Sequence, residues 1–227
     1  MRESRHFGLI GGLGVGATII YYQQIADACI ARGVIPQLTI THAHAPTALA
    51  HVQAGRIAGM ATYLANFIRQ AGAAGATFAA IPAVTPHICR AELKQQISLP
   101  LVDMLDVTAA HLRHRKLGRI ALFGTKFTIE SRLFGALGDI DVVPPRDAEI
   151  AEIHRIYLLL ATAGNCAPED VARLRDIANT LCTRDDVEAI VLAGTDLNLI
   201  FNEANAGFPA VDCAAAHIAA IVDRMTS

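Results

Sequence analysis

Short apolar runs that recur at a nearly constant distance constrain the fold of this chain more than any other feature. The run at 6–12 is similar to the run at 119–125, an offset of 113 residues. The run at 77–84 is similar to the run at 188–195, an offset of 111 residues. Two such pairs at almost one offset indicate a duplicated α/β half. Because any two buried strands share apolar residues, chance similarity is the alternative explanation.

Segments with helical spacing separate these runs. Strands are expected at 36–40, 77–81, 99–104 and 119–123, and helices at 18–32, 56–71, 86–96 and 106–115. Apolar residues make up 53% of the chain and charged residues only 18%, which suits helices packed on buried parallel sheets. We therefore expect an α/β fold with two pseudo-symmetric lobes, each a mainly parallel sheet flanked by helices.

The repeat also predicts how the chain is divided. The N-terminal lobe is expected to span 1–103, with 208–227 packing back on it, and the C-terminal lobe 104–207. Ligands of such folds bind at the carboxyl ends of parallel strands, and a cleft between two lobes is a common site. The site is therefore predicted in the inter-lobe cleft, on the loops 11–18, 41–47, 82–87, 124–131 and 193–198.

Composition excludes several classes of protein. With 19 Lys and Arg against 21 Asp and Glu, no basic surface is available for nucleic acid. The apolar run at 7–10 is too short for a signal peptide or a membrane span. Five dispersed cysteines without a CxxC pair predict reduced thiols rather than zinc or disulfides. A cytoplasmic protein with no nucleic-acid or membrane partner is the expectation.

A glycine-rich loop at 11–16 follows the first strand and precedes a helix. It is similar to a dinucleotide loop, but Thr41–His44 stand where an acidic residue would bind ribose. Nucleotide binding is therefore a minor alternative. Backbone N–H groups at a helix N-terminus suit a small anion, so Gly12 is predicted to help hold a carboxylate.

Polar side chains follow the other predicted strands. Four threonines could form a carboxylate cradle or cap helices: Thr85, Thr125, Thr128 and Thr195. Asp196 is the one carboxylate directly after a predicted site strand, so it is either an acid–base group or an N-cap.

Two histidines complete the set of candidate groups. Histidine is the side chain best suited to acid–base chemistry near neutral pH, and His42 and His44 would point the same way if their strand continued. They could form half of a metal site, but no third ligand is evident, so neither a metal nor a cofactor is predicted.

In their order, several segments resemble the cofactor-independent aspartate/glutamate racemase family over nearly the whole chain. These are the segments at 8–14, 71–87, 121–128, 153–164, 189–197 and 209–212. The resemblance implies a homodimer and two catalytic cysteines, one for each face of the substrate Cα. Ala83 and Gly194 stand at those positions, and neither side chain can carry a proton. Two-thiol racemisation is therefore excluded.

The resemblance also implies charged groups for a second carboxylate, where this chain has Pro46 and Thr162. The remaining residues could hold one carboxylate. The predicted binding residues are Gly12, Ala83, Val84, Gly194 and the four threonines. One hypothesis is a divergent enzyme that acts on a small carboxylate or carbonyl compound by non-cysteine chemistry at Asp196, His44 and His42. An isomerase, lyase, decarboxylase or cyclase would fit. The alternative is an inactive homologue that binds a small ligand.

Overall fold

The computed structural model describes residues 2–227 and divides them into two compact units. Unit 1 ends at Met104 and resumes at 217–227, and unit 2 spans 105–216. The sequence analysis ended the second lobe at 207. The boundary lies later because the last strand, at 210–212, pairs with a strand of unit 2.

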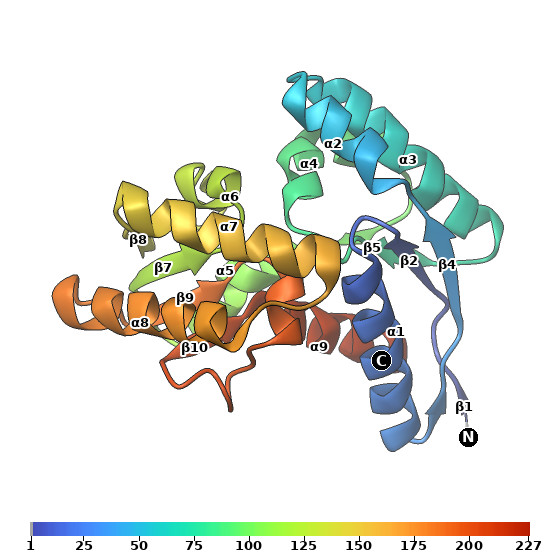
Figure 1. Ribbon diagram of the computed structural model, residues 1–227. Helices are drawn as coiled ribbons and strands as arrows, with labels where there is room; N and C mark the ends of the chain where they lie inside the picture. Colours follow the sequence, from blue (N-terminus) through green and yellow to red (C-terminus); the bar gives the residue numbers. More distant parts are fainter. Residues whose placement is uncertain (1) are drawn as a thin grey trace. The chain divides into compact units, whose positions relative to one another are not determined.

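Unit 1 is built on a four-stranded parallel sheet (Figure 1). The strand order is β4 (Leu38–His42), β2 (Phe7–Gly11), β5 (Phe78–Ala80) and β6 (Leu101–Val102). A separate parallel pair joins β1 (Arg2–Glu3) to β3 (Val34–Ile35). The helices are α1 (Val15–Ala31), α2 (Ala45–Gln53), α3 (Ile57–Ala73), η1 (Thr85–Cys89) and α4 (Arg90–Gln96), with most of α9 (Cys213–Thr226).

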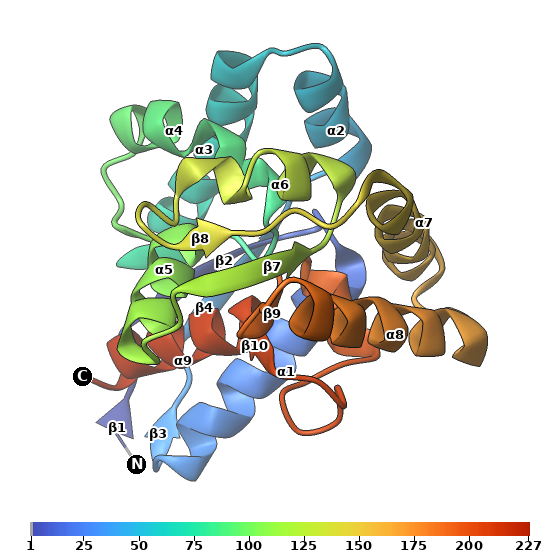
Figure 2. The same cartoon turned by 90° about the vertical axis from the view of Figure 1, so that its left-hand side faces the viewer.

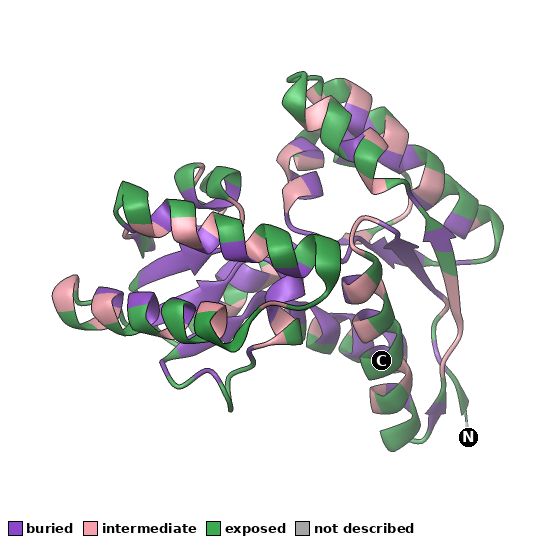
Figure 3. Ribbon diagram, viewed as in Figure 1, coloured by how far each residue is buried: buried purple, intermediate pink, exposed green. Residues whose placement is uncertain are grey.

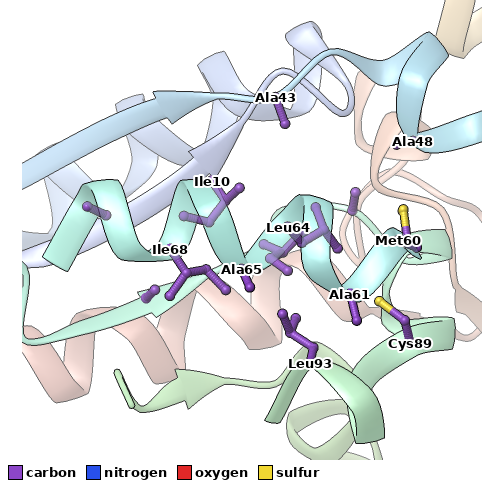
Figure 4. Packing of buried hydrophobic residues seen from close by; sticks show 14 of the residues in the cluster. Ile10, Ala43, Ala48, Met60, Ala61, Leu64, Ala65, Ile68, Cys89 and Leu93 are labelled. Carbon is purple, nitrogen blue, oxygen red and sulfur yellow. The ribbon is translucent and has the colours of Figure 1, made fainter. Parts of the chain in front are cut away.

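Alternation along β2 places helices on both faces of this sheet. A Cβ added to Gly8 would lie 2.8 Å from the Cβ of Ala71, so this face of β2 packs against α3. Ile10 faces the same way and joins the cluster around Leu64 (Figure 4). A Cβ on Gly11 would lie 2.5 Å from Thr18 Cγ2, which places α1 on the other face. Burial on both faces explains why the strand is apolar throughout.

Unit 2 contains a second four-stranded parallel sheet (Figure 2). Its order is β8 (Asp141–Val142), β7 (Arg119–Phe123), β9 (Ala189–Leu192) and β10 (Ala210–Asp212). Its helices are α5 (Met104–His114), α6 (Lys126–Glu130), η2 (Leu133–Gly135), α7 (Asp147–Ala163), α8 (Pro168–Arg184) and η3 (Thr195–Leu199).

Both sheets have the same strand order. In each, the second strand lies at an edge, followed by the first, the third and the fourth. The two segment pairs found in the sequence fall on β2 with β7 and on β5 with β9. Figure 3 shows these strands as the buried centre of each unit. The predicted α/β class, with parallel sheets flanked by helices, is confirmed.

Helix α2 was not predicted. The sequence analysis treated 41–47 as a loop, but α2 begins at Ala45. Pro46 lies in its first turn, where a missing backbone N–H costs no hydrogen bond. Among residues 2–227, no helix combines the length and apolarity that crossing a membrane requires.

Candidate functional site

The turn after β9 brings together three residues predicted for the site. Gly194 is the N-cap of η3, and both Thr195 and Asp196 are buried within that short helix. Asp196 Oδ2 accepts a hydrogen bond of 3.0 Å from the hydroxyl of Tyr157 on α7. Because Gly194 holds the cap position, Asp196 is not the N-cap that the sequence analysis left open.

Burial shifts the pKa values of both Asp196 and Tyr157. Burial raises the pKa of Asp196 above its usual 3.8, and the hydrogen bond from Tyr157 partly offsets that effect. Burial, reinforced by the negative charge of Asp196, raises the pKa of Tyr157 well above 10. At neutral pH the phenol is therefore protonated and donates to the carboxylate.

Tyr157 also explains the glycine at position 194. A Cβ on Gly194 would lie 2.3 Å from Cε2 of the Tyr157 ring. Gly194 has a φ of −151°, an extended conformation open to any residue. Space rather than backbone conformation therefore excludes a side chain at 194. The sequence analysis missed Tyr157. Its one signal was a glycine where a functional side chain was expected.

The turn after β7 contains two further predicted residues. Thr125 caps α6, since its Oγ1 accepts the backbone N–H of Thr128 at 3.1 Å, and the two hydroxyls lie 2.9 Å apart. Capping, one of the two alternatives, thus holds for Thr125. The N–H of Lys126 donates to His154 Nδ1 at 3.2 Å. Helix α7 therefore contacts both strand ends, through His154 and Tyr157.

In unit 1, the loops after β2 and β4 lie against each other. Gly12 has a φ of +86°, and a Cβ on it would lie 2.1 Å from the carbonyl oxygen of Ala43 and 2.9 Å from His42 Cε1. Only glycine fits there. The Gly12 N–H donates to Thr18 Oγ1 at 3.1 Å, so this N–H already has a partner within the loop.

His42 and His44 are both exposed, on either side of the buried Ala43. The strand ends at His42, and His44 is the N-cap residue of α2. The Tyr63 hydroxyl accepts the His44 N–H at 2.7 Å, and His44 Nδ1 lies 2.9 Å from Thr47 Oγ1. Between residues 2 and 227, no group of three or more His, Cys, Asp or Glu side chains is arranged to hold a metal ion.

The turn after β5 holds the remaining predicted residues. Ala83 and Val84 are buried, and Thr85 begins η1. His87 Nδ1 lies 2.8 Å from the carbonyl oxygen of Ala83, and His87 Nε2 accepts the N–H of Met104 at 3.4 Å. Burial lowers the pKa of His87, against the opposing charge of the Asp103 carboxylate. His87 is therefore a neutral residue that fixes the turn.

Position 198 is the counterpart of His87 in unit 2. Asn198 stands four residues after Gly194, as His87 stands four residues after Ala83. With its amide nitrogen facing Asp212, Asn198 donates to both carboxylate oxygens, at 2.9 and 3.0 Å. Asp212 also accepts the N–H groups of Ala214 and Ala215 at the start of α9. This pair is structural as well.

A sequence profile described as Asp/Glu/Hydantoin racemase matches residues 10–221, nearly the whole chain. The chain belongs to this family. Solved structures show the same fold. A putative Asp/Glu racemase from Yersinia pestis has a TM-score of 0.83 at 24% identity, covering 98% of each chain. An aspartate racemase homologue from Pyrococcus horikoshii has a TM-score of 0.81 at 22% identity, covering 96% of this chain and 98% of that chain.

The family fold extends to a more distant enzyme. The maleate isomerase Iso from Pseudomonas putida has a TM-score of 0.58 at 15% identity, covering 98% of this racemase-family chain and 92% of its own. At such identities the similarity establishes the fold alone. Whether the predicted residues bind substrate stays a prediction.

Proposed function

We propose that this racemase-family chain catalyses proton transfer at a carbon next to the carboxylate or carbonyl group of a small substrate. The observation that carries the proposal is the buried Asp196 carboxylate at the end of β9, hydrogen-bonded to Tyr157 at 3.0 Å. A titratable pair at the carboxyl end of a parallel strand is typical of an active site.

Two further observations support this class of reaction. Relatives of the same fold are described as an aspartate racemase homologue and a maleate isomerase, which are names for reactions of small carboxylates. At the positions that the resemblance gives to cysteines, Ala83 and Gly194 carry no proton. The chemistry therefore requires other acid–base groups, and Asp196 is the buried carboxylate at one of these turns.

The remaining predicted residues have matching roles. Asp196 removes or returns the proton, with exposed His42 and His44 as further candidate acid–base groups. The substrate carboxylate is held by hydroxyl and backbone N–H groups. Of the residues predicted to bind it, Thr125, Thr128, Gly194 and Thr195 belong to the same unit as Asp196 and are proposed as these donors. Such donors stabilise the enolate-like intermediate that forms when the proton leaves.

Solvent deuterium exchange tests this proposal. The protein is incubated in D2O with amino acids, 2-oxo acids, 2-alkylmalonates and maleate, and NMR follows exchange, isomerisation and decarboxylation. We expect turnover of at least one compound, reduced about 100-fold or more by Asp196→Asn. His42→Ala and His44→Ala test the histidines. Rates unchanged in Asp196→Asn and His44→Ala would contradict the assignment. Ligand binding without turnover would instead support the inactive homologue.

A further inference from the structure

Helix α7 brings the Tyr157 ring into the space that a side chain at position 194 would occupy. The ideal Cβ of residue 194 would lie 2.3 Å from Cε2, 2.9 Å from Cδ2 and 3.0 Å from Cζ of that ring. These atoms belong to the edge of the ring that leads to the hydroxyl. The phenol therefore extends from α7 to the end of β9. It fits there because Gly194 has no side chain.

The hydroxyl is held there by a specific partner. Tyr157 donates to Asp196 at 3.0 Å, and Asp196 stands two residues after Gly194 in the same short helix. Asp196 is 6% exposed and Tyr157 is half-buried as a residue, so the hydrogen bond between them lies largely out of contact with water. Cys213 also lies close enough to affect Tyr157 electrostatically, but its thiol donates to the carbonyl oxygen of Leu192 at 2.7 Å.

We infer that the Tyr157 hydroxyl is the group that exchanges the proton with the substrate carbon, and that Asp196 acts through it. This inference rests on the proposed function and adds a further catalytic residue to it. The place is the one that the family resemblance gives to a cysteine. Gly194 has no side chain that can carry a proton, and Tyr157 of α7 provides one next to it.

The proton balance of this step is closed. The substrate C–H bond breaks as a new O–H bond forms on Tyr157, and the electron pair stays on the substrate as an enolate-like anion. In the same step the original phenol proton moves to Asp196, so the tyrosine remains neutral throughout. The reverse relay returns a proton to the carbon. Burial raises the pKa of Asp196 and so makes its carboxylate a stronger base for this relay.

A ring without its hydroxyl separates catalysis from packing. Tyr157→Phe keeps the ring that fills the space at Gly194 and removes the proton carrier. We expect kcat for the exchanging substrate to fall about 100-fold or more, with KM changed less than about threefold and the melting temperature nearly unchanged. Tyr21→Phe is the matched control, because it removes another buried hydroxyl, bonded to His217 Nδ1 at 3.0 Å. Its kcat should stay within about twofold of wild type.

A second variant tests the position itself. In the double variant Tyr157→Ala and Gly194→Cys, the cavity left by the ring accommodates the new side chain, and a thiol stands at the turn. We expect the double variant to exchange at least tenfold faster than the Tyr157→Ala single variant. A merely structural role of the ring predicts no such recovery.

The outcomes distinguish this inference from the function on which it rests. If Asp196→Asn abolishes wild-type exchange and Tyr157→Phe leaves kcat intact, the role of Tyr157 is overturned and the proposed function stands. If the wild-type protein turns over none of the compounds, both are overturned. Loss of kcat in Tyr157→Phe, with normal activity of Tyr21→Phe, supports the inference.

Discussion

The turns after β5 and β9 occupy equivalent places in two sheets of the same strand order, yet their polar groups serve different purposes. In unit 1, His87 bonds to the carbonyl of Ala83 and is neutral because it is buried. In unit 2, Asp196 and the phenol of Tyr157 form a hydrogen-bonded pair beside Gly194. The titratable group beside Ala83 is bonded to the backbone of its own turn, whereas the one beside Gly194 is bonded to a side chain of α7.

A similar difference separates the turns after the first strands. Gly12 and Thr125 are related by the offset of 113 residues. Gly12 has a positive φ and lies against the backbone at Ala43, whereas Thr125 has an extended conformation and caps α6. Two sheets of the same strand order thus carry different turn conformations at equivalent places, because the contacts of each unit determine its own turns.

The largest expected effect concerns Gly12. In Gly12→Ala the new Cβ would lie 2.1 Å from the carbonyl oxygen of Ala43, and the backbone would keep a φ of +86°. A backbone atom cannot move aside as a side-chain tip can. We expect a loss of about 3 kcal/mol or more in the free energy of unfolding, measured by urea denaturation.

Gly33→Ala is the matched control for that variant. Gly33 has a φ of +70°, but an added Cβ would meet nothing within 4 Å. Its cost should be only about 1 kcal/mol, from the left-handed conformation alone. Equal losses in the two variants would show that the close approach of the two loops of unit 1 carries no energy.

The sequence predicted the fold well because the signals that define it are local and repeated. The apolar runs of β2 and β7 are long enough to stand out, and their offset relates the two sheets. Helix α2 was missed because Pro46 looks like a loop residue unless it is placed in a first helical turn. Residues 208–227 were all expected on the N-terminal lobe, because the pairing of β10 with β9 is a non-local contact that no local pattern encodes.

The next effect concerns a buried histidine found in unit 1. His217 lies between the Tyr21 hydroxyl, at 3.0 Å, and the carbonyl oxygen of Val102, at 2.9 Å. Burial lowers its pKa from 6.5 to about 3. The unfolded chain therefore binds the proton more readily than the folded one, and stability is lost as pH falls below 6.5. The described histidines of unit 2 are half-buried or exposed.

We expect this histidine alone to cost about 2 kcal/mol of stability between pH 7 and pH 5. The free energy of unfolding of the wild type should fall by at least that much, whereas His217→Gln should show a change smaller by the same amount. Urea denaturation at both pH values measures the difference. An identical pH dependence of the two proteins would mean that His217 does not titrate between the folded and unfolded states.

The candidate site was only partly predictable. Asp196 stood out because it follows an apolar strand directly, and strand ends are readable from sequence. Tyr157 lies 39 residues away on α7, within the apolar run 156–160, where no pattern distinguishes it from its neighbours. Tyr157 becomes a candidate site residue only in the structure, where its ring lies against Gly194. Residues that reach a site from a flanking helix have no local signature.

A smaller effect tests the counterpart of Gly12. Thr125→Ala removes the hydroxyl that accepts the Thr128 N–H at 3.1 Å. We expect a loss of about 1 kcal/mol, the usual cost of an N-cap. Thr180→Ala is the control, because the hydroxyl of the half-buried Thr180 only bonds back to a carbonyl of its own helix, and it should cost less than about 0.5 kcal/mol. If Thr125→Ala proved as neutral as this control, the hydroxyl would have no capping role and would be available to a ligand.

The finest test of the contrast is the order in which buried aspartates titrate. Burial would raise the pKa of Asp103 in unit 1, but the charges of Lys94 and Arg90 beside it help to lower it below 3.8. Burial dominates at Asp196 and Asp212 in unit 2 and raises the pKa of both. In carbon-detected NMR of the carboxyl groups, Asp103 should therefore keep its charge to the lowest pH of the three.

One variant tests the cause of this titration order. Lys94 Nζ lies 2.9 Å from Asp103 Oδ2, so Lys94→Met should raise the pKa of Asp103 and leave Asp196 and Asp212 unchanged. If Asp103 and Asp196 titrated together in the wild type, the neighbouring cations would not lower the pKa of Asp103 as predicted. The predicted order makes Asp196 and Asp212 stronger bases than Asp103, since a carboxylate held ionised by cations is the weaker base.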